Sequence, residues 1–483
     1  MRYKILSVLA AALLVGGTGC SDLTSINQNP NGPLDVAPPS IISNVIQSVV
    51  GGVNGVNPMN IRGGGLWVQY YSEIQYRDED KYIVRSGTSG GWGFYSGAAQ
   101  DAQRMIDKGV AASVPNWSAV GRIMKSYVFS VMTDAMGDLP YSQALKGLDN
   151  LTPTYDTQKA IYDSLFADLT RAGGEIDPAG IGFATGDIMY GGNMARWRKF
   201  ANSLRLRLAV HLANAPGSAA KAASEAQAAV TAGVFASDSD NAQITYLATS
   251  PNRNPIYDDA RGRDDYGMSE TYVDSLLSWN DPRLPVFAQL NKDTIVANRT
   301  YRGLQNGLND GAGPPLFYIS RIGAYWRETP NAPMALLTYS EVLFLEAEAA
   351  ERGWIAGNAA TLYTAAIRAS MAQYGISQAA ADAYVAQARV TYVPGATGLA
   401  QIAYQKWVSL FMQGMESWTE VRRTGVPVIV PGPNAVLSAM PERLPYDDNE
   451  LVLNKTNVDA AVAAQGFGAS NDLSTPLWYT GRQ

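Results

Sequence analysis

The chain has 483 residues, of which 46 % are hydrophobic and only 17 % are charged, and 43 Asp and Glu residues outnumber its 37 Lys and Arg residues. The formal net charge of -6 argues against nucleic acid as a partner, because an acidic surface repels phosphate backbones. This length and hydrophobic content are ample for a large core. With a single cysteine, Cys20, no intramolecular disulfide can form.

The first residues have the layout of a secretory leader. Arg2 and Lys4 precede an apolar run over 5–15, and small residues then lead to Cys20. The run is too short to span a bilayer, so the layout predicts a lipoprotein signal peptide over residues 1–19. Cleavage before Cys20 exposes this residue for lipidation, with a diacylglyceryl group on its thiol and an acyl chain such as palmitate on its amine. An ordinary leader followed by an unmodified cysteine is the alternative.

Residues 20–40 are rich in Pro, Asn and Gly, which predicts an extended tether between the lipid anchor and the first helix. Loss of the leader removes two basic residues and leaves a net charge of -8. No later segment is long enough and apolar enough throughout to span a membrane, so we expect membrane contact through the lipid anchor only. Residues 41–483 are expected to form a single domain.

Helical periodicity dominates this domain. Apolar residues recur at three- and four-residue steps and predict antiparallel helix pairs over 117–136 with 157–171, 195–213 with 218–231, and 334–352 with 358–374. In the third pair, Ala359, Leu362, Tyr363 and Ala366 follow the small-then-large spacing of tetratricopeptide hairpins. The sequence therefore predicts a mostly α protein on a tetratricopeptide-like helical-hairpin scaffold.

Two aromatic stripes predict further buried helix faces. One runs from Tyr404 to Trp418, and the other consists of Trp67, Tyr70, Tyr71 and Ile74 on one helix. We expect the second set to lie in the core.

Residues 238–333 form a different region, rich in proline and aromatic side chains and without sustained periodicity. Loops of such length in a compact protein are usually functional or disordered, and the aromatic content argues against disorder. We therefore predict long irregular loops that cover one face of the helical scaffold.

Five segments in order along the chain carry a family resemblance. They are 134–144 (DAMGDLPYSQA), 197–208 (WRKFANSLRLRL), 337–349 (LTYSEVLFLEAEA), 414–425 (GMESWTEVRRTG) and 441–446 (PERLPY). Together they resemble the SusD/RagB family of outer-membrane lipoproteins, and the similarity runs from the leader to the C-terminus. Five matching segments in the same order are much more specific than any single motif.

The resemblance implies a SusD-like fold and a nutrient-binding lipoprotein on the outside of the outer membrane. Such a protein partners a SusC-like TonB-dependent transporter, captures an oligosaccharide or peptide, and performs no chemistry on it. No cofactor is implied. Glu341, Trp418, Glu420 and Arg422 lie in the family motifs and are expected to be structural. The family's ligand contacts vary between members, so no ligand residue is transferred.

A glycine-flanked aromatic cluster offers the first candidate ligand residues. Trp92 and Tyr95 follow Gly90 and Gly91 just before a predicted helix. Flat aromatic faces suit the C–H surfaces of sugar rings, so we predict that Trp92 and Tyr95 contact ligand. The alternative is a tryptophan that closes a helix end in the core.

The central region supplies the other candidates. Hydrogen-bonding groups alternate with aromatic residues there, a mixture suited to sugar hydroxyls and ring faces. The predicted ligand residues are Arg253, Tyr257, Tyr266, Tyr318, Arg321 and Trp326. Aromatic loops also cover the exposed core of a scaffold, and arginines suit carboxylates as well as hydroxyls. Neutral glycans, acidic glycans and peptides therefore all stay open as ligands.

His211 is the only histidine and lies in an apolar helical stretch. We expect it to be packed and hydrogen-bonded, because no spacing of zinc ligands or of a Ser-His-Asp triad accompanies it. No metal site is predicted. Two other functions compete with binding alone: a lipid-anchored glycan-degrading enzyme, which needs only two carboxylates, and a structural assembly protein built on helical repeats.

Overall fold

The computed structural model describes residues 36–84 and 91–482. The predicted leader, Cys20 and most of the tether lie outside these residues. The first described helix begins at Pro38 and not at Ile41, and Pro38–Gln483 form one compact unit. Among the described helices, none is long and apolar enough to cross a membrane.

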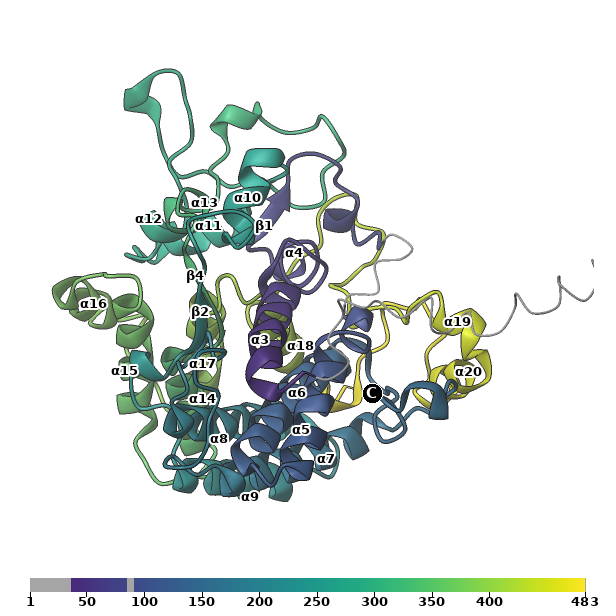
Figure 1. The fold of residues 1–483 in the computed structure, drawn as a ribbon. Coiled ribbons are helices and arrows are strands. Elements are labelled where there is room, and N and C mark those ends of the chain that lie inside the picture. Colours follow the sequence, from purple (N-terminus) through teal and green to yellow (C-terminus); the bar gives the residue numbers. More distant parts are fainter. Residues whose placement is uncertain (1–35, 85–90, 483) are drawn as a thin grey trace, which may run out of the picture. The chain divides into compact units, whose positions relative to one another are not determined.

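Helices account for most of the ordered elements (Figure 1). In chain order they are α3 (Pro38–Asn54), α4 (Gly64–Trp67), α5 (Ala98–Ala111), α6 (Pro115–Met136), α7 (Gln158–Glu175), α8 (Met194–His211), α9 (Ala219–Ala232), α10 (Pro255–Gly262), α11 (Glu270–Ser278), α12 (Leu284–Phe287), α13 (Ala324–Arg327), α14 (Tyr339–Glu351), α15 (Ala359–Ala372), α16 (Gln378–Val385), α17 (Ala396–Ser409), α18 (Gly414–Thr424), α19 (Glu450–Leu453) and α20 (Lys455–Ala464). The strands are β1 (Tyr71–Glu73), β2 (Ala242–Thr245), β3 (Tyr266–Met268) and β4 (Pro333–Leu337).

The three predicted helix pairs are present as α6 with α7, α8 with α9, and α14 with α15, each packed against its partner. Local cap chemistry sets where several of these helices begin. The side chains of Thr157, Asn193 and Asn358 accept backbone N–H groups at the starts of α7, α8 and α15. Helix α8 also packs against α14, which joins the second and third pairs. The mostly helical, tetratricopeptide-like fold expected from the sequence is confirmed.

Residues 334–337 correct the third predicted pair. They form strand β4, which pairs antiparallel with β2, and helix α14 begins only at Tyr339. Thr338 caps that helix by accepting the N–H of Glu341. A short apolar run has no period that separates strand from helix, and its pairing partner lies far away in the sequence. The predicted helix start at 334 is therefore wrong.

Both aromatic stripes are also broken. Helix α17 ends at Ser409 and α18 begins at Gly414, because Met412 between them has a left-handed backbone with φ of 72°. In the second stripe α4 ends at Trp67, and the chain then enters β1 at Tyr71. The prediction of a single helix is therefore wrong for each stripe. The expected burial is correct, since Trp67, Tyr70, Tyr71 and Ile74 are all buried.

The region 238–333 contains more regular structure than expected. Strands β2 and β3 and helices α10 to α13 fall within it, separated by loops. In Figure 1, α10 to α13 gather at one end of this unit, and α7 and α9 lie at the opposite end. Strand β3 pairs with β1, so the region is tied to the N-terminal part of the domain.

Candidate ligand-binding groove

Two adjoining hollows lie where the chain leaves β1. The larger one, the apolar hollow, has a volume of about 670 Å³ and is lined by 74–77 and 310–316. The smaller one, the charged hollow, has a volume of about 240 Å³. Its lining is Val56, Arg62, Glu73, Gln75, Tyr76, Glu79, Asp259, Arg263, Asp265 and Tyr266. Gln75 and Tyr76 line both hollows, which together form what we call the Tyr76 groove.

The β1–β3 pair positions this groove. Its antiparallel register sets Glu73 opposite Tyr266, and the Ile74 N–H donates to the Asp265 carbonyl at 2.8 Å. Beyond β1 the chain turns at Tyr76, whose φ is 56° and whose side chain is 57 % exposed. A left-handed backbone is uncommon for an aromatic residue, and such positions cluster at ligand sites. The fold therefore holds Tyr76 at the boundary between the hollows.

Arg77 fixes one wall of the apolar hollow. Its Nη1 donates to the carbonyls of Asn309 and Ala312, both at 2.8 Å, and its backbone N–H donates to Asp310 Oδ1 at 3.2 Å. Arg77 is buried. These bonds tie the segment after β1 to the turn at 309–312, although the two are far apart in the sequence. The segment that carries Tyr76 and the opposite wall of the apolar hollow are therefore bonded to each other.

Charged groups crowd the smaller hollow. The guanidinium of Arg62 pairs with Glu79, and that of Arg263 pairs with Asp265 at 2.6 Å. The Arg263 guanidinium also lies 4.7 Å from the ring centroid of Tyr76, within cation–π range. Burial and the nearby Glu79 and Asp80 carboxylates raise the pKa of Glu73 to about 10. This carboxyl is therefore protonated at neutral pH and can donate a hydrogen bond.

The predicted residues of the central region lie in different places. Tyr266 lines the charged hollow. Tyr257 is half-buried, with the Arg261 guanidinium 3.3 Å and the Arg253 guanidinium 5.4 Å from its ring centroid. Arg253 in turn pairs with Asp258 at 2.7 Å. Tyr257 and Arg253 line neither hollow.

Three further predicted residues support the groove or lie behind it. Tyr318 is half-buried and stacks near Phe317, just beyond the wall of the apolar hollow. Arg321 pairs with Asp264 at 2.9 Å and donates to the Leu316 carbonyl at 3.2 Å, so it braces that wall from inside. Trp326 is buried among Phe287, Tyr374 and Phe411 and offers little surface to a ligand.

Trp92 and Tyr95 belong to a separate aromatic cluster. The half-buried Trp92 ring lies 5.0 Å from Tyr95, 6.5 Å from Tyr155 and 6.4 Å from Tyr446, measured between centroids. Tyr95 donates its hydroxyl to the Pro140 carbonyl at 2.6 Å. Neither side chain lines the Tyr76 groove. Their role as ligand contacts stays a prediction that competes with the Tyr76 groove, and the Trp92→Ala variant distinguishes the two.

Tyr76, Gln75 and Arg77 were not predicted as site residues. The available signal was weak: an aromatic residue between polar neighbours, just beyond the stripe that was assigned to one helix. A three-residue strand whose partner lies in a distant region has no local pattern.

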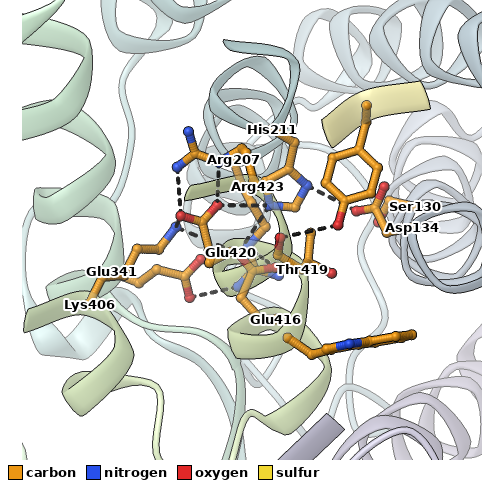
Figure 2. Close-up of polar contacts among 12 residues, drawn as sticks. Ser130, Asp134, Arg207, His211, Glu341, Lys406, Glu416, Thr419, Glu420 and Arg423 are labelled. Carbon is orange, nitrogen blue, oxygen red and sulfur yellow. Dashed lines mark hydrogen bonds and ion pairs between the residues drawn. The ribbon is translucent and has the colours of Figure 1, made fainter. Parts of the chain in front are cut away.

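His211 lies inside a buried network of charges (Figure 2). Its Nδ1 is 2.9 Å from Asp134 and its Nε2 is 3.1 Å from Glu416. Burial alone lowers the pKa of His211, but the Glu416 and Asp134 carboxylates outweigh it and raise the pKa to about 9. Both ring nitrogens therefore donate, and the expected packed and hydrogen-bonded histidine is confirmed.

The acidic side chains of this network are paired with buried cationic side chains. His211, Glu416 and Glu420 come close enough together to suggest a metal site. However, Glu416 already faces Lys406 at 3.6 Å, and Glu420 pairs with Arg423 at 2.6 Å (Figure 2). The motif residues Glu341, Trp418, Glu420 and Arg422 are all buried, as expected of structural positions.

Comparison with known proteins agrees with this architecture. A family model described as "Starch-binding associating with outer membrane", of SusD-like type, matches residues 30–447. A chitin-binding protein of known structure is 30 % identical, with a TM-score of 0.80, covering 92 % of this chain and 99 % of its own. A SusD homologue from Bacteroides fragilis is 26 % identical, with a TM-score of 0.80 and coverages of 93 % and 100 %. A chitin-binding SusD homologue from Flavobacterium johnsoniae is 25 % identical, with a TM-score of 0.78 and coverages of 92 % and 98 %. No protein with a curated description matches the chain.

The helical-hairpin scaffold together with these matches identifies the class as outer-membrane nutrient-binding proteins. The chain belongs to the SusD-like family, and the resemblance read from its motifs is confirmed. Members of this family are associated with the outer membrane.

Proposed function

We propose that this protein captures an oligosaccharide in the Tyr76 groove and delivers it, chemically unchanged, to a SusC-like TonB-dependent transporter. The observation that carries the proposal is Tyr76, an exposed ring held between two hollows with the Arg263 guanidinium near it. Ligand pockets typically combine such an aromatic surface with a few polar groups. The family description and two chitin-binding relatives support a saccharide ligand.

Lipidation at Cys20 and an outward-facing position complete the proposal. The family's association with the outer membrane supports them. A protease added to intact cells should degrade the protein, and a Cys20→Ala variant should leave the membrane fraction. Protection from protease until lysis would contradict the outward position. Recovery of a transporter of the same operon after mild detergent extraction and pull-down would support the partner, and its repeated absence would oppose it.

Binding is tested by calorimetry with oligosaccharides of chitin, cellulose, starch and xylan. Tyr76→Ala should weaken the tightest of these interactions about tenfold, since loss of a stacked ring costs roughly 1.4 kcal/mol. Trp354→Ala is the matched control: Trp354 is half-buried, has the Arg352 guanidinium 5.4 Å from its ring and lines neither hollow. Equal effects of the two changes would reject the groove.

Absence of catalysis is part of the proposal. After prolonged incubation, the bound oligosaccharide should be recovered intact by chromatography. Shorter products whose release is lost in a carboxylate-to-amide variant of the groove would establish the enzymatic alternative.

A further inference from the structure

The charged hollow holds more carboxyl groups than cations. Four carboxyl side chains line it, from Glu73, Glu79, Asp259 and Asp265, against the two guanidinium groups of Arg62 and Arg263. Each guanidinium is already engaged: Arg62 with Glu79, and Arg263 with both Asp265 and the Tyr76 ring. Both cations that a ligand would meet in this hollow are therefore already paired with a carboxylate.

The other two carboxyl groups belong to Glu73 and Asp259. Among the described residues, no Lys or Arg forms an ion pair with Glu73 or Asp259. Glu73 Oε2 accepts the Asp80 N–H at 3.1 Å, and the Glu73 carboxyl also shares a hydrogen bond with that of Glu79. Burial and the Asp265 carboxylate raise the pKa of Asp259 to about 6, and the Arg263 and Arg327 guanidinium groups oppose this rise only in part. At neutral pH, Asp259 is mostly ionised and Glu73 is protonated.

We propose that the charged hollow sets the ligand class of the groove: it accepts uncharged saccharides and rejects anionic ones, with Asp259 as the specificity-determining residue. This inference rests on the proposed function. A sugar hydroxyl or an acetamide N–H can donate to the Asp259 carboxylate. A uronate or sulfate must lie beside Asp259 or separate an existing ion pair, and like charges at close range in a partly buried site are costly.

Pairs of oligosaccharides that differ in charge test this inference. Neutral hexasaccharides of chitin, cellulose, starch and xylan are compared by calorimetry with the anionic hexasaccharides of hyaluronan and polygalacturonate. We expect the tightest ligand to be neutral and to bind at least about tenfold more tightly than either anion, which corresponds to one close like-charge contact. An anionic hexasaccharide as the tightest ligand would overturn the inference.

The residue assignment is tested with Asp259→Asn. Asp274→Asn is the matched control, because Asp274 is exposed on α11, lines neither hollow and gives the same change in net charge. Asp259→Asn should raise the ratio of anionic to neutral affinity several-fold, because the amide oxygen still accepts from a sugar hydroxyl but carries no charge that repels an anion, whereas Asp274→Asn should leave this ratio unchanged. Equal gains in the two variants would mean that net charge alone acts, and would reject the role of Asp259.

The two proposals fail in different ways. If no oligosaccharide binds, or if binding does not depend on Tyr76, the proposed function fails. If binding depends on Tyr76 but neutral and anionic sugars bind equally, only the present inference fails. An unchanged melting temperature of Asp259→Asn shows that the variant is folded.

Discussion

His211 Nδ1 lies 2.9 Å from Asp134 Oδ2, in a contact that joins α8 to α6 in the centre of the helical scaffold (Figure 2). The imidazole is almost fully buried, and its second nitrogen faces Glu416 on α18. One protonated side chain thus links three helices that are distant in the sequence. Two of the motif residues, Glu341 and Glu420, are held in the same buried network through Arg207 and His211.

The first prediction concerns the pH dependence of stability. His211 has a folded-state pKa of about 9 against an ordinary histidine pKa of 6.5, so its stabilising contribution is complete below pH 6.5 and lost as pH rises through 9. The full linkage amounts to about 3 kcal/mol. Urea unfolding of the wild type and His211→Gln should show a difference in unfolding free energy that shrinks across this range. A difference that does not change with pH would mean that His211 is neutral in the folded protein.

The second prediction concerns the buried pair of Arg207 and Glu341. Arg207 Nε and Nη2 donate to the two carboxylate oxygens at 2.6 and 2.7 Å. Arg207→Met should lower the free energy of unfolding by about 3 to 5 kcal/mol, because it leaves a buried carboxylate unpaired. Arg207→Met combined with Glu341→Leu should recover part of this loss. A double variant less stable than the sum of both single changes would contradict this explanation.

The third prediction concerns Arg77, which positions the wall of the apolar hollow. Lysine keeps the charge but cannot reach the carbonyls of Asn309 and Ala312 together, so Arg77→Lys should release the turn at 309–312. We expect several-fold weaker oligosaccharide binding and a destabilisation of about 1 to 3 kcal/mol. Both are measured on one preparation, by calorimetry and thermal unfolding. Unchanged affinity despite lower stability would remove this wall from the binding site.

The fourth prediction concerns Trp92. Its ring contacts Tyr95, Tyr155 and Tyr446 but lines neither hollow. Trp92→Ala should therefore lower the melting temperature, since removal of a packed aromatic ring costs on the order of 3 kcal/mol, and leave oligosaccharide affinity within about twofold. A tenfold loss of affinity in a stable variant would instead establish Trp92 as a ligand residue.

The sequence predicted the scaffold because its helices carry local signals. The stripe through Trp197, Phe200, Leu204 and Leu208 lies within one segment, and the helix that it predicts over 195–213 agrees with α8, Met194–His211, to within two residues at each end. Strand β4 was mistaken for helix because only its pairing with β2 distinguishes it. The parts of the scaffold whose structure follows local periodicity could therefore be predicted from the sequence.

The groove was harder to predict, since long-range pairing creates it. Tyr266 was recognised as an aromatic residue in a loop-rich region, whereas Tyr76 was not, although register places their segments side by side. Trp326 has the same sequence signature as a ligand-stacking residue and lies in the core. Aromatic content alone cannot separate these cases, because burial depends on elements that are distant in sequence.

The most direct test of the account is a crystal structure of the protein with its tightest oligosaccharide. We expect a sugar ring in contact with Tyr76, with the oligosaccharide in the apolar hollow and hydroxyl groups directed at Glu73 and Asp259. A saccharide bound over Trp92 and Tyr155, with the Tyr76 groove empty, would contradict it.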